Sequence, residues 1–160
     1  MSGTDSSFRT LNNLELSNYS AGILIADILY KHYPVRLKAK GDSMFPLILN
    51  NDLITVSPWK CRIPEVGDIV VCFDNSRQRF VIHRVVRIKK KNYEIKGDFC
   101  FHTDGYFAFD NLIGYVSTIN HHHDILPFPI QLKLKKIISF LSRTNLLTLI
   151  AKIVKKYLTK

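Results

Sequence analysis

Cysteine is scarce in this chain and is not arranged to cross-link it or to bind a metal. The three cysteines are an odd number and none belongs to a C-x-x-C pair, which argues against a disulfide framework and against a cysteine zinc site. Free thiols are typical of a reducing compartment. With 160 residues, of which 46% are hydrophobic, the chain has enough apolar material for one core without cross-links.

Long apolar runs and phosphate-binding loops are also missing. The most apolar early segment, residues 21–30, contains Asp27 and is far shorter than the ~20 residues that span a bilayer. Residues 1–7 are polar and lack the basic and apolar regions of a secretory signal peptide. No glycine-rich phosphate-binding loop occurs. We therefore expect a cytoplasmic protein that needs no cofactor.

Positive charge is concentrated at the C-terminal end. The net charge is +10, but residues 128–160 carry eight Lys or Arg and no acid, so the other 127 residues, with 15 bases and 13 acids, carry only +2. The tail has helical periodicity, with Thr144-Asn145 as the expected N-cap of its second half. A basic amphipathic tail either packs on the body or lies on an anionic membrane at the inner face. Nucleic acid is disfavoured because no aromatic platform or DNA-reading helix accompanies the charge.

Three segments follow from hydrophobic periodicity. Residues 1–34 form an N-terminal helical segment with a helix over 13–32, residues 35–120 a β domain, and residues 128–160 the basic helical tail. Short β-rich runs at 53–56, 68–73, 80–88, 92–96 and 113–119 alternate with turn signals. This spacing predicts a compact, mostly antiparallel sheet or partly open barrel.

Four residues of the β segment could carry chemistry. Ser43 lies in a turn between Gly41 and Pro46, where a hydroxyl and its own backbone N–H can address one carbonyl. His83 lies on a β-branched run and has the pKa range of a general base. Either Asp98 or Asp104 could accept the other ring N–H of the histidine. Each feature alone is weak, since turn serines and strand histidines are common.

The order of these motifs closely resembles the signal peptidase I family over about residues 37–119. The matching segments are Gly41-Asp42-Ser43-Met44-Phe45-Pro46, Asn51-Asp52-Leu53-Ile54-Thr55-Val56, Val66-Gly67-Asp68-Ile69-Val70-Val71, His83-Arg84-Val85, Lys96-Gly97-Asp98 and Ile113-Gly114-Tyr115-Val116. The resemblance implies a mainly β, signal-peptidase/LexA-like antiparallel domain with flanking helices, α+β overall. It also implies a serine endopeptidase in which Gly41, Met44 and Pro46 support the nucleophile Ser43.

The family has two branches, and the chain resembles the one with a histidine base. Members of the other branch, including LexA-like self-cleaving regulators, carry lysine where this chain has His83. The histidine branch carries an aspartate six residues beyond its Gly-Asp aspartate, as Asp104 stands beyond Asp98. The resemblance thus implies a Ser43-His83-Asp104 triad with Asp98 supporting the loop. Phe99 and Cys100 replace the family's usual asparagines.

The expected function is cleavage of leader or signal peptides through an acyl-enzyme. Family members that process exported proteins have a membrane helix before the serine, where this chain has an amphipathic segment, so it resembles short anchorless bacterial relatives. The alternative is an inactive peptide-binding module, which Phe99-Cys100 motivates. A self-cleaving regulator is disfavoured because residues 1–36 are too short for a helix-turn-helix. His121-His122-His123 is interpreted as a loop rather than a metal site, and His102 ranks below His83 as base.

Overall fold

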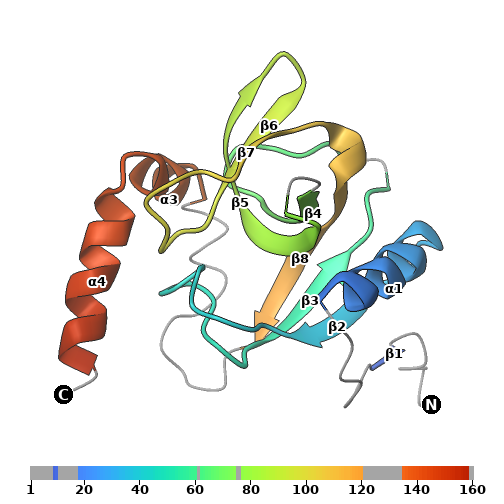
Figure 1. Cartoon of the computed structure of the whole chain (residues 1–160), viewed down its shortest axis with the longest axis horizontal. Coiled ribbons are helices and arrows are strands. Elements are labelled where there is room, and N and C mark those ends of the chain that lie inside the picture. Colours follow the sequence, from blue (N-terminus) through green and yellow to red (C-terminus); the bar gives the residue numbers. More distant parts are fainter. Residues whose placement is uncertain (1–8, 11–17, 61, 75–76, 121–134, 159–160) are drawn as a thin grey trace, which may run out of the picture.

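The structure of the protein, a computed structural model, describes residues 9–10, 18–60, 62–74, 77–120 and 135–158. These residues form a mainly β domain with helices near both ends of the chain. This α+β arrangement confirms the predicted fold class. Figure 1 shows α1 on one side of the sheet and α3 with α4 on the other. The elements are β1 (Arg9–Thr10), α1 (Asn18–Tyr30), β2 (Val35–Lys38), β3 (Leu53–Ser57), β4 (Ile69–Asp74), β5 (Arg79–Lys89), β6 (Asn92–Lys96), β7 (Gly105–Phe107), a short 3-10 helix η1 (Phe109–Asn111), β8 (Leu112–Asn120), α3 (Lys135–Arg143) and α4 (Leu146–Leu158).

The strands form one curled sheet in the order β1-β2-β3-β8-β4-β5-β6-β7. Every neighbouring pair is antiparallel except β1 and β2. Register shifts where β8 pairs with β3 and with β4, and where β5 pairs with β6, bend the sheet, because an extra residue on one strand increases its local twist. The five predicted strands are confirmed as β3, β4, β5, β6 and β8. The other three, β1, β2 and β7, are only two to four residues long and were not predicted.

Apolar side chains cover both faces of the sheet, which explains its continuous apolar runs. In β4, Ile69 and Val71 belong to one core cluster and Val70 and Cys72 to another. Successive residues of a strand point to opposite faces, so a strand with two buried faces has no polar alternation. The sheet is therefore a rigid platform for side chains that project from β5.

Helix α1 occupies most of the predicted helix over 13–32; residues 13–17 of that prediction lie outside the described residues. Ile28 and Leu29 of α1 are buried in the core. Gly22 lies within this helix, where glycine is unfavourable, and packing explains its presence. A Cβ at this position would lie 1.6 Å from the Phe80 ring of β5, so only glycine lets the ring pack this closely on α1.

Helices α3 and α4 confirm the helical character of the basic tail over the described residues 135–158. Asn145 occupies the predicted N-cap position of α4, since its carbonyl accepts the Leu149 N–H, but its Oδ1 atom has no hydrogen-bond partner. The Thr144 hydroxyl donates back to the Phe140 and Leu141 carbonyls of α3. Asn145 has a φ of 62° and its N–H donates to the Ser142 carbonyl. These residues end α3 in a left-handed turn instead of capping α4 through a side chain.

Candidate functional site

Ser43 lies in the loop between β2 and β3, and the sequence around it explains why the loop is fixed. Gly41 has a φ of +87°, a conformation suited to glycine, and its N–H donates to Asn50 Oδ1 at 3.0 Å. Met44 is buried in the core beneath the loop. The Phe45–Pro46 peptide bond is cis. The predicted supporting residues Gly41, Met44 and Pro46 thus surround Ser43, whose side chain remains half-buried.

His83 projects from the middle of β5 and meets the serine. Its Nε2 atom lies 2.9 Å from Ser43 Oγ, across 40 residues of sequence. Only 6% of His83 is exposed, and β5 is paired on both sides by β4 and β6. The imidazole is therefore held by a strand in the interior of the sheet. The competing His102, in the loop before β7, is exposed.

Asp104 completes a line of three polar side chains. Its Oδ2 atom lies 2.5 Å from His83 Nδ1, and its backbone N–H donates to the Ile95 carbonyl. Arg79 and Arg77 place positive charge 3.7 and 3.9 Å from its other oxygen. With Nδ1–H donating to Asp104, Nε2 is left to accept a proton from Ser43. The structure brings Ser43, His83 and Asp104 together in the geometry that nucleophile activation by a general base requires.

Asp98 does not contact His83 in this way but forms a buried ion pair with Arg84. Arg84 Nη2 lies 2.6 Å from Asp98 Oδ2 and Nε lies 2.9 Å from Oδ1, while Nη1 donates to the Gly67 carbonyl. Asp98 is fully buried and Arg84 is 2% exposed. Because His83 and Arg84 are successive residues of β5, the strand directs one to Asp104 and the other to Asp98. The structure thus places Asp98, which was predicted to support the loop, in a buried ion pair with Arg84.

Gly97 lies against the Ser43-His83 pair. A Cβ at this position would lie 2.8 Å from the Ser43 carbonyl oxygen and 3.0 Å from His83 Nε2. The Phe99 N–H also donates to the Ser43 carbonyl at 2.8 Å. The 97–100 turn is therefore packed directly on the backbone of the serine loop, and this contact requires a residue without a side chain.

Gly97→Ala is expected to slow covalent labelling of Ser43 by a serine-directed phosphonate about 100-fold, because the new methyl group displaces the serine backbone from His83. Labelling is followed by intact-protein mass spectrometry. Gly114→Ala is the matched control, since its Cβ would crowd the Ser57 carbonyl at the same 2.8 Å, but between β3 and β8. Equal labelling rates for the two folded variants would contradict a positioning role for Gly97.

Neither a buried cysteine nor Lys96 is suited to act as nucleophile or base in place of Ser43 and His83. Burial raises the pKa of the Cys72 thiol and that of the Cys100 thiol, which keeps both protonated and poorly nucleophilic. Cys61 lies outside the described residues. Burial also lowers the pKa of Lys96, against the opposing effect of Asp98. The Lys96 ammonium donates to the Ser142 carbonyl at the end of α3, so this lysine links β6 to the tail.

The tail contacts the site from the far end of the sequence, which the sequence did not predict. The Thr148 hydroxyl of α4 lies 3.0 and 3.1 Å from the Asp98 and Cys100 carbonyl oxygens. Lys155 of α4 pairs with Asp42 at 2.7 Å, next to the serine. In Figure 1, α4 accordingly lies along the 97–104 segment and the serine loop. Helix α4 therefore braces the two loops that carry Ser43 and Asp104.

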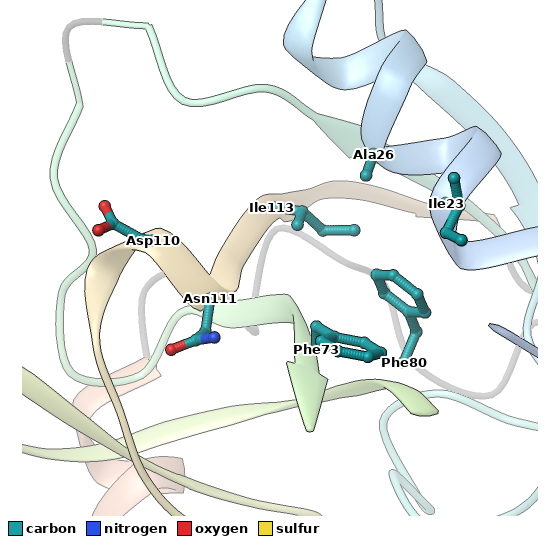
Figure 2. Close-up of a pocket in the computed structure, with 7 residues that line it drawn as sticks. All are labelled: Ile23, Ala26, Phe73, Phe80, Asp110, Asn111 and Ile113. Carbon is teal, nitrogen blue, oxygen red and sulfur yellow. The ribbon is translucent and has the colours of Figure 1, made fainter. Parts of the chain in front are cut away.

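A separate apolar cavity of about 300 Å³ lies between α1 and the sheet. Figure 2 shows Ile23 and Ala26 of α1 above the rings of Phe73 and Phe80, whose centroids are 4.7 Å apart. Ser43, His83 and Asp104 do not line this cavity. It is therefore distinct from the site described above.

Among the described residues, no group of three His, Cys, Asp or Glu side chains could hold a metal ion. The histidines at 121–123 lie outside the described residues. No single helix in the described ranges is long and apolar enough to cross a membrane; α3 and α4, which meet at a 90° bend, pass that test only as a pair, by length and composition. No protein-family model matches the sequence, and no curated protein matches it.

Proposed function

We propose that the protein is a serine endopeptidase of the signal peptidase I type, with Ser43 as nucleophile, His83 as general base and Asp104 as the residue that orients it. The observation that carries the proposal is the hydrogen-bonded line from Ser43 Oγ through His83 to Asp104, at 2.9 and 2.5 Å. The ordered motifs that resemble this family add to it. The proposed substrates are leader or signal peptides, and the proposed location is the cytoplasm.

The reaction would proceed through an ester on Ser43. Ser43 Oγ attacks the scissile carbonyl carbon while its proton passes to His83 Nε2. The tetrahedral intermediate collapses when His83 gives that proton to the leaving amine and the C–N bond breaks. Water then attacks the ester carbonyl carbon while its proton passes to His83 Nε2. His83 gives this proton to Ser43 Oγ as the ester C–O bond breaks, which releases the acid and free serine. Asp104 remains a carboxylate throughout and accepts the Nδ1–H.

The oxyanion formed in each step needs hydrogen-bond donors. The Ser43 backbone N–H is the proposed first donor. The Gly41 N–H is engaged by Asn50, and Gly41 offers no hydroxyl, so the second donor comes from another residue. The substrate would pair as an extended strand with a nearby sheet edge, as in other cases of strand addition.

A non-catalytic peptide-binding module is the second candidate. Phe99 and Cys100, which replace the usual asparagines, favour it. The T-shaped contact of the Phe99 and Phe45 rings shows that the Phe99 side chain packs on the serine loop as an apolar ring, where an asparagine side chain could donate a hydrogen bond. Such a module would bind the same peptides and form no ester.

Covalent labelling separates the two candidates. The full chain is treated with a biotinylated fluorophosphonate, and the modified peptide is identified by mass spectrometry. The peptidase hypothesis predicts one adduct on Ser43, its loss in Ser43→Ala, and a strong decrease in His83→Ala. Peptide binding without any adduct on folded wild-type protein would support the module and contradict the peptidase.

A further inference from the structure

Among the residues that the structure describes, the largest group of exposed apolar side chains lies on α3 and α4. Sixteen large apolar side chains are exposed among the described residues, and half of them belong to these two helices. Phe140 is 58% exposed and Tyr157 is 75% exposed. The eight residues, here called the hairpin face, are Ile137, Phe140, Leu146, Leu149, Ile150, Ile153, Val154 and Tyr157. Exposed apolar side chains gathered on two successive helices indicate a contact with another phase or molecule.

The hairpin face is separate from the surface by which the helices hold the sheet. In α3, Ser139 is buried and donates to the Val85 carbonyl. In α4, Thr148 and Ala151 are buried. At about 3.6 residues per turn, the exposed apolar positions of α4 fall within an arc of roughly 140° that excludes both of these residues. Each helix thus has a polar or small inner face and an apolar outer face, the reverse of an ordinary surface helix.

Positive charge borders the hairpin face. The two helices contain six Lys or Arg and no acid. Lys136, Lys152 and Lys156 are exposed, and their helical positions lie along one margin of the apolar arc. Apolar side chains flanked by basic residues complement a membrane surface, where the chains enter the acyl boundary and the ammonium groups meet anionic headgroups. A second copy would bring two basic margins together, which disfavours self-association.

We infer that the hairpin face docks on an anionic membrane, with α3 and α4 lying in the interface and the β domain above it. The 90° bend between the helices and their hydrogen bonds to the sheet favour this in-plane position. Since α4 also contacts the loops of Ser43 and Asp98, docking holds the site next to the lipid surface. The position of the site at the lipid surface matters only under the proposed peptidase function, whereas the docking itself does not depend on that function.

Vesicle flotation tests the docking. The full chain carrying Ser43→Ala is mixed with phosphatidylcholine vesicles that contain about one-third phosphatidylglycerol, and with phosphatidylcholine alone, at low and high salt. Binding is expected for the anionic vesicles and is expected to weaken as salt rises. Because this chain lacks the nucleophile, failure of docking and failure of peptidase activity are separate results.

Two variants and their matched controls identify the surface. Ile150→Ser/Ile153→Ser is expected to weaken binding about tenfold or more, and Lys136→Gln/Lys156→Gln about fivefold per charge. The controls make the same changes at exposed positions outside the hairpin: Ile23→Ser/Ile88→Ser and Lys38→Gln/Lys89→Gln. They are expected to bind as the parent does. No flotation of the folded chain, equal losses in the controls, or a stable dimer that does not bind vesicles would overturn the inference.

Discussion

Ser43→Ala and His83→Ala are each expected to lower the rate of peptide cleavage about 10⁶-fold, and the double variant is expected to lose no more than either one alone. The reason is the single proton path between Ser43 Oγ and His83 Nε2, which lie 2.9 Å apart. When one end of this path is missing, the other has no partner to activate, so the two losses do not add. Residual cleavage would come from substrate binding and oxyanion stabilisation.

The measurement uses quenched-fluorescent peptides with small residues before the cut, as the family resemblance suggests. His102→Ala is the control for the histidine, because His102 is the exposed alternative base in the neighbouring loop. Ser20→Ala on α1 is the control for the serine. Both controls are expected to cleave at the wild-type rate. Full activity in His83→Ala, or losses that multiply in the double variant, would contradict the proposed chemistry.

The sequence predicted much of this fold because the sheet contains local signals. The β-branched runs of β3, β4, β5, β6 and β8 are separated by turn residues, and each run is long enough to show its type. Strands β1, β2 and β7 have two to four residues, so they depend on their neighbours and carry little local pattern. The start of the last helix after Thr144-Asn145 was predicted, but the side-chain cap was not formed, because the same residue types also end helices.

The candidate site could be predicted only in part. Motif order brought Ser43 and His83 to attention and the resemblance favoured Asp104 over Asp98, but the contact of Asp104 with the imidazole depends on the path of the loop after β6. The contacts of Thr148 and Lys155 could not be predicted. Lys155 is 113 residues from Asp42, and neither residue carries a local motif that identifies its partner. Packing of the tail against the sheet creates these contacts.

Asp98→Asn is expected to lower the free energy of unfolding by about 3–5 kcal/mol, the second large effect. Its carboxylate is fully buried and balances the buried guanidinium of Arg84. Loss of that negative charge leaves Arg84 uncompensated in a medium that solvates it poorly. Chemical denaturation followed by circular dichroism measures the change.

Asp104→Asn is the matched substitution for Asp98→Asn. Comparing the two separates the charge of Asp98, which stabilises the fold, from the charge of Asp104, which serves the reaction. Asp104 lies at the edge of the domain, 11% exposed, with its second oxygen facing Arg77 and Arg79. Asp104→Asn is expected to cost less stability than Asp98→Asn but to slow cleavage about 10⁴-fold. The reason is that the Nδ1–H of His83 loses its carboxylate acceptor, so the imidazole is no longer held in the tautomer whose Nε2 accepts the serine proton. Arg84→Met combined with Asp98→Asn is expected to recover stability, since no buried charge is then left alone. If instead Asp98→Asn slowed the reaction of fully folded protein as much as Asp104→Asn, the division between the two aspartates would be wrong, and the Arg84 ion pair would belong to the chemistry as well as to the fold.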